Sequence, residues 1–165
     1  MIGVLLGIIA VFLVVFLEHM FLSLFAFSVA LLVIINIWGR IDFKLSSLIV
    51  ILTGLALDVT LHLPLGFNIL VLGTVLFVFF LISLMVPLDR TSSRYSVIFF
   101  VFLFGYILNP FLASILQDSV VPSFSWSDIF KFVFNSLISV LICILIDRIL
   151  FSFRDSNNFE KIRLR

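Results

Sequence analysis

Long apolar stretches separated by short polar segments make up most of this chain. A helix that crosses a membrane needs about 20 consecutive, mostly apolar residues, and these stretches match that length rather than the length of a strand. We therefore predict an all-α membrane protein with six transmembrane helices in one domain, 1–165. The predicted spans are 2–17, 20–38, 45–61, 67–86, 97–116 and 128–150, followed by a basic tail, 151–165.

The boundaries of the spans come from polar and helix-breaking residues. Residues 2–38 are apolar except for Glu18, His19 and a few small polar residues, and they are too many for one span at 1.5 Å per residue. We therefore predict a turn at Glu18-His19, although neither glycine nor proline marks it. Pro64-Leu65-Gly66 predicts a second turn, between the third and fourth spans.

The composition excludes two other classes of protein. Hydrophobic residues make up 64% of the chain, charged residues make up 12%, and the mean hydropathy is +1.40. A soluble domain has about 25% charged residues, and a disordered chain has few aromatic residues, whereas this one has 22 phenylalanines. The single cysteine, Cys143, excludes an intrachain disulfide and a cysteine-rich metal site.

The basic residues predict the orientation of the six helices. If alternate helix ends define two sides of a membrane, nine of the ten basic residues fall on one side and only Lys131 falls on the other. The nine are Arg40, Lys44, Arg90, Arg94, Arg148, Arg154, Lys161, Arg163 and Arg165. Loops rich in lysine and arginine stay in the cytoplasm, so we predict that both termini are cytoplasmic.

Asp58 is the polar residue that most needs an explanation. It lies about 20 Å along the third predicted span, and an acid there costs at least about 2.5–3.5 kcal/mol unless it has a partner. Its carboxylate could bind the unpaired N–H groups at the start of the next helix. A proton or cation path, or a contact with a partner, remains a second interpretation.

Other polar residues also fall near the predicted outer face. This candidate outer polar cluster contains Glu18, His19, His62 and Asn68. Carboxylates and imidazoles could bind a divalent metal, but the spacing is loose and polar residues gather at helix ends in any case. The chain also lacks the common nucleotide-binding, serine-hydrolase and zinc-protease motifs. We therefore predict no catalytic site, no metal and no cofactor.

Small residues predict close helix contacts. Gly3-x-x-x-Gly7 lies in the first predicted span and Ala26-x-x-x-Ala30 in the second. Residues of this size let two helix backbones approach closely. The two pairs could pack inside the bundle or dock a second membrane protein, and the spacing does not separate these alternatives.

The last two spans carry further polar signals. One face of the sixth span repeats polar or small residues every four positions and is predicted to face the bundle interior. These residues are Asn135, Ser139, Cys143 and Asp147. Asn109-Pro110 predicts a bend in the fifth span beside Tyr106, and Ser125-x-x-Asp128 predicts the start of the sixth.

The segment around Asp58 resembles the signature of the MreD family of rod-shape-determining bacterial proteins. The matching residues are Gly54, Leu55, Asp58, Pro64, Leu65 and Gly66. The resemblance implies a non-enzymatic scaffold in the bacterial inner membrane that takes part in cell elongation and peptidoglycan synthesis. It also implies an MreC-like bitopic partner, further contacts with the MreB filament and the RodA–transpeptidase synthase, and no nucleic acid.

The MreD fold is similar to that of the substrate-binding subunits of energy-coupling-factor vitamin transporters. That similarity implies an alternative function, a ligand-binding membrane subunit of such a transporter. The outer polar cluster would then be the candidate ligand site, and the small-residue pairs would suit either function.

Overall fold

The computed structural model describes residues 2–25, 28–37, 43–86, 91–118 and 124–163. This part of the chain is all-helical and contains no strand, which confirms the predicted fold class at that level. The helices are α1 (Ile2–Phe25), α2 (Val29–Ile37), α3 (Phe43–Thr60), α4 (Phe67–Met85), α5 (Thr91–Ala113) and α6 (Trp126–Arg163), and the π-helical turn η1 (Ser114–Asp118) follows α5.

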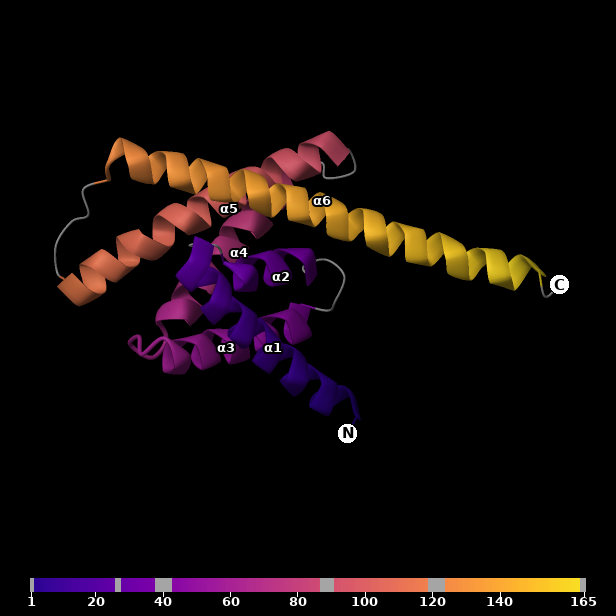
Figure 1. Cartoon of the computed structure of the whole chain (residues 1–165), viewed down its shortest axis with the longest axis horizontal. Coiled ribbons are helices and arrows are strands. Elements are labelled where there is room, and N and C mark those ends of the chain that lie inside the picture. The colour runs from indigo at the N-terminus through magenta and orange to yellow at the C-terminus, as the bar shows by residue number, and fades with distance from the viewer. Residues whose placement is uncertain (1, 26–27, 38–42, 87–90, 119–123, 164–165) are drawn as a thin grey trace.

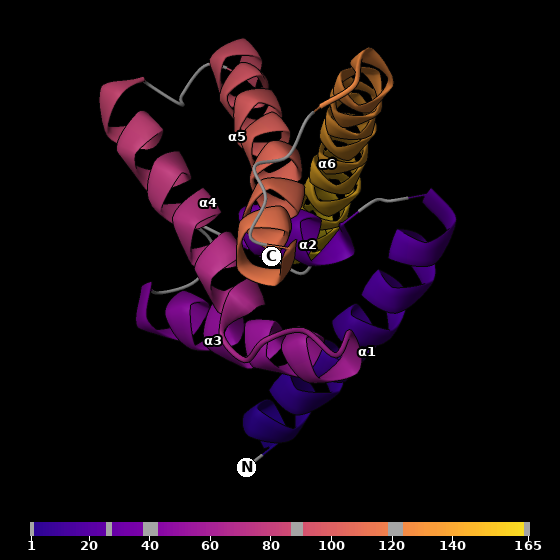
Figure 2. The ribbon, with the colours of Figure 1, turned by 90° about the vertical axis from the view of Figure 1, so that its left-hand side faces the viewer.

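The helices form three consecutive pairs around a shared core. Helices α5 and α6 pack along each other, α4 packs against α5, α3 against α4, and α1 against α3 and α2. The short helix α2 also touches α3, α5 and α6, so it lies at the centre of the molecule (Figures 1 and 2). Its buried apolar residues, Ala30, Leu31, Leu32, Ile34 and Ile35, belong to the main core.

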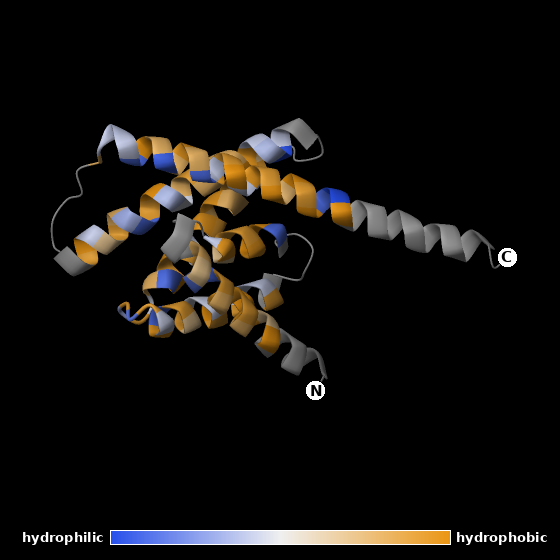
Figure 3. Ribbon diagram, in the orientation of Figure 1, coloured by the Kyte–Doolittle hydropathy of each residue, from blue (hydrophilic) through white to orange (hydrophobic). Residues whose placement is uncertain are grey.

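Apolar residues make up most of the described helices (Figure 3), and many large apolar side chains are exposed. Large side chains such as Phe12 and Phe77 are 74% and 60% exposed. Within the described residues, three helical stretches are long and apolar enough to cross a membrane: Phe67–Met85, Ser93–Leu116 and Trp126–Ile149. Two shorter apolar helices, Ile9–Phe21 and Leu45–Thr60, accompany them. This surface would be unstable in water and suits a lipid environment.

The first predicted turn is in the wrong place. Helix α1 continues through Glu18 and His19 to Phe25, and α2 begins only at Val29. An acid without a partner is costly inside an apolar helix, and this cost is the reason to predict a turn beside it. Glu18 is 3% exposed and is satisfied by the helix that follows, so α1 does not have to end beside it.

The other predicted boundaries agree with the structure to different degrees. Helices α3 and α4 lie within two residues of the predicted third and fourth spans, while α5 begins at Thr91 rather than at residue 97. Helix α6 does not end at residue 150 but continues to Arg163, through most of the predicted tail. Figure 1 shows this last part of α6 extending away from the other helices.

Candidate functional site: carboxylates at two helix hairpins

The turn between α3 and α4 begins with a left-handed residue. His62 has a φ angle of 54°, and the N–H of Leu63 donates to the carbonyl of Asp58 at 2.9 Å. This six-residue closure is the Schellman motif, in which the residue just past the helix adopts the left-handed conformation. The motif ends α3 and leaves the side chain of Asp58 directed at the start of α4.

Asp58 is buried, at 1% exposure, and caps helix α4. Its Oδ2 accepts a hydrogen bond from the N–H of Gly66 at 2.6 Å. Its Oδ1 accepts one from the backbone N–H of Asn68 at 2.8 Å and one from the Nδ2 of Asn68 at 2.9 Å. Gly66 is the N-cap residue of α4 and has no side chain to do this. The capping role predicted for Asp58 is therefore present in the structure.

Gly54 allows α3 and α4 to approach closely beneath this cap. A Cβ atom added at Gly54 would lie 2.7 Å from Cγ1 of Ile69 and 2.8 Å from its backbone nitrogen. Separations below 3.0 Å are not seen for real Cβ atoms, and the backbone of Ile69 cannot give way as a flexible side chain could. The Gly54, Asp58 and Gly66 of the sequence motif therefore fix the spacing, the cap and the turn of a single hairpin.

Glu18 caps the N-terminus of α2 in the same way that Asp58 caps the N-terminus of α4. Its Oε1 accepts the hydroxyl proton of Ser28 at 2.7 Å, and its Oε2 accepts the N–H of Ala30 at 2.7 Å. Ser28 is the N-cap residue, and its Oγ accepts the N–H of Leu31 at 3.3 Å. In two successive helix pairs, a carboxylate near the end of the first helix therefore binds the N-terminus of the second.

Tyr106 connects the α2 cap to α6. Its hydroxyl oxygen accepts the backbone N–H of Ser28 at 3.3 Å and lies 3.0 Å from Oγ of Ser139. Ser139 donates its own proton to the carbonyl of Asn135 at 2.8 Å. Since each hydroxyl has one proton, Tyr106 must donate to Ser139. The resulting network holds α1, α2, α5 and α6 together.

The polar face predicted on the sixth span points inward. Asn135, Ser139 and Cys143 are all buried, and Nδ2 of Asn36 in α2 approaches the sulfur of Cys143 to 3.1 Å. Near the other end of the same face, the Oδ2 of Asp147 lies 3.3 Å from a guanidinium nitrogen of Arg94 and accepts the hydroxyl of Tyr95 at 3.2 Å.

The start of α6 also follows the predicted motif. The Oδ2 of Asp128 accepts the N–H of Ser125 at 3.2 Å, and the carbonyl of Ser125 accepts the N–H of Asp128 at 3.0 Å. This is one half of a capping box.

The candidate outer polar cluster is not brought together as one site. Glu18 and Asn68 are buried in separate caps, whereas His19 and His62 are exposed. In the part of the chain that the structure describes, no three histidine, cysteine or acidic residues lie where they could hold a metal ion. Of these residues, Glu18 and Asn68 take part in the two caps, and His62 ends α3.

Of the four small residues that were predicted to make close helix contacts, the structure describes the surroundings of only one. Ala30 is fully buried in the first turn of α2. Gly3 and Gly7 belong to α1, but the structure does not describe their surroundings, and Ala26 lies outside the described residues.

Sequence reasoning missed the cap formed by Glu18. The usable signal was Ser28, a good N-cap residue directly before the apolar run that begins at Val29. Together with an acid ten residues earlier, it could have indicated a second hairpin like that of Asp58. In the described part of the chain, every buried side-chain nitrogen and oxygen atom has a partner. The buried polar groups are thus used to hold helices together.

Comparison of the chain with protein-family models, with curated proteins and with solved structures finds no match. The class of protein therefore rests on the fold itself. The described chain is an all-helical protein with three helices that are long and apolar enough to cross a membrane.

Proposed function

We propose that this protein is a non-enzymatic scaffold of the MreD type in the bacterial inner membrane. In this proposal the chain crosses the membrane six times with both termini in the cytoplasm. It binds an MreC-like bitopic protein and helps to assemble the cell-elongation machinery that makes peptidoglycan.

The observation that carries the proposal is the geometry of the α3–α4 hairpin. The residues that resemble the MreD signature are Gly54, Asp58 and the Pro64-Leu65-Gly66 turn, and together they build this hairpin. Gly54 contacts the Ile69 backbone, Asp58 caps α4, and Gly66 adopts a φ angle of 94° at the N-cap position. A signature whose members cooperate in one structural unit supports the resemblance better than residues scattered over the fold would.

The use of the buried polar groups favours a scaffold over the transporter alternative. A vitamin-binding site needs several polar side chains that converge on a cavity. Glu18 and Asp58 bind helix N-termini instead, and Asn68 donates to Asp58. A rigid bundle with an apolar exterior offers helix surfaces for a membrane partner.

Affinity purification from native membranes in a mild detergent, followed by mass spectrometry, tests the proposal. We expect an MreC-like bitopic protein and wall synthases to be recovered with the protein. A matched sample carrying Gly54→Leu, which prevents the close approach of α3 and α4, should lose them. Recovery of a transmembrane coupling subunit with two ATPases would instead establish the transporter alternative.

A further inference from the structure

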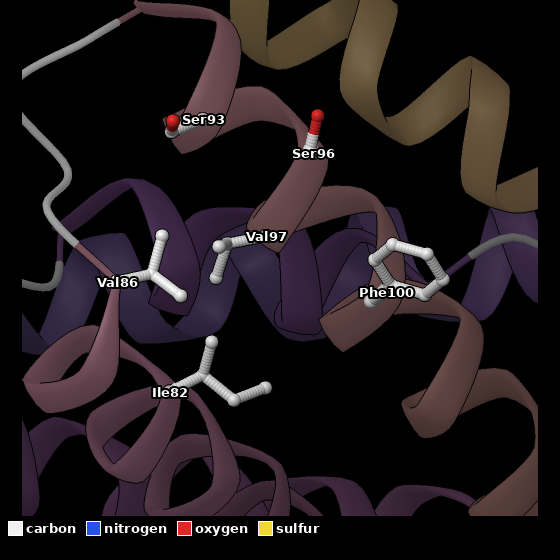
Figure 4. Close-up of a pocket in the computed structure, with 6 residues that line it drawn as sticks. All are labelled: Ile82, Val86, Ser93, Ser96, Val97 and Phe100. Atoms are coloured by element: carbon white, nitrogen blue, oxygen red, sulfur yellow. The ribbon is translucent and has the colours of Figure 1, made fainter.

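We draw no further inference here: the strongest candidate, the mostly apolar pocket of about 410 Å³ between the end of α4 and the first turns of α5 (Figure 4), carries none because nothing in the structure shows what covers it.

Discussion

His62 shows how a single residue can be constrained by its backbone rather than by its side chain. It is the one non-glycine residue with a positive φ angle in the described chain, and its imidazole is exposed. The sequence places this histidine in the candidate outer polar cluster, where an imidazole could bind a metal. The structure gives it a backbone role instead, at the left-handed position that ends α3.

His62→Gly should therefore stabilise the protein. Glycine adopts the left-handed conformation without the penalty of about 1–2 kcal/mol that other residues incur, which outweighs its entropy cost in the unfolded chain. Thermal unfolding in detergent should show a higher midpoint. His19→Gly is the matched control, because His19 lies inside α1, where glycine costs about 1 kcal/mol. A lower midpoint for both variants would contradict this role of His62.

Asp58 makes three hydrogen bonds with two oxygens, so its variants should fall into a definite order. Asp58→Asn keeps one acceptor oxygen but places an amide against a donor. Asp58→Ala leaves the N–H groups of Gly66 and Asn68 unpaired, at about 1–3 kcal/mol for each. We expect thermal stability to fall moderately for Asn and at least twice as far for Ala. An equal loss of thermal stability for Asn and Ala would point to a role that depends on the charge.

At the scale of elements, the spacing between α3 and α4 depends on one of two glycines. Gly54 faces the backbone of Ile69 at contact distance, while a Cβ at Gly73 would meet nothing within 4 Å. Both are glycines inside apolar helices. Helix propensity alone does not say which of them is crowded, because the path of the neighbouring helix decides it.

Gly54→Ala and Gly73→Ala should consequently have opposite effects. The first forces α3 and α4 apart and should destabilise the protein by about 1–3 kcal/mol. The second relieves the helix penalty of glycine and should be neutral or stabilise by up to about 1 kcal/mol. Midpoints of thermal unfolding, measured side by side in one detergent, provide the comparison. Equal effects would mean that the two helices do not pack as described.

The network through Tyr106 joins helices that are far apart in the sequence. Tyr106→Phe removes the acceptor of the Ser28 N–H and the donor to Ser139. We expect a loss of about 1–3 kcal/mol, because a buried N–H then lacks a partner in an apolar environment. Ser139→Ala should cost less, and a double-mutant cycle should give a coupling energy above about 0.5 kcal/mol. Additive losses would show that the two hydroxyls act independently.

On the scale of the whole molecule, the helix ends gather in two groups. In Figure 1, both ends of the chain lie on the same side as the end of α2 and the start of α3. The end of α5 and the start of α6 lie on the opposite side. Helix α6 has 38 residues and is therefore about 57 Å long. The hydrocarbon core of a bilayer is about 30 Å thick, so a helix of this length that crosses it would extend beyond it at the basic end.

Reporter fusions test the orientation that the basic residues predict. A reporter placed after Arg165 should read as cytoplasmic, and one inserted between Asp118 and Ser127 should read as extracytoplasmic. Lys131→Gln should leave both results unchanged, because it removes the single basic residue that opposes the predicted orientation. The reverse pattern would refute the charge argument.

The sequence by itself determined the helical class, the apolar exterior and the α3–α4 hairpin. These features depend on local signals: continuous hydrophobicity, a proline and a glycine in a short turn, and an acid within reach of the next helix. The cap formed by Asp58 could be predicted because its partners follow within ten residues.

Only the tertiary structure decided how the remaining polar groups are used. It shows that α1 continues through Glu18-His19 to Phe25 and that α2 lies at the centre of the bundle. Tyr106 meets Ser28 across 78 positions of the chain, and no local pattern encodes such a contact. The physical reason is that an ionisable or hydroxyl group in an apolar stretch must find a partner, while the sequence alone does not say which distant helix will provide it.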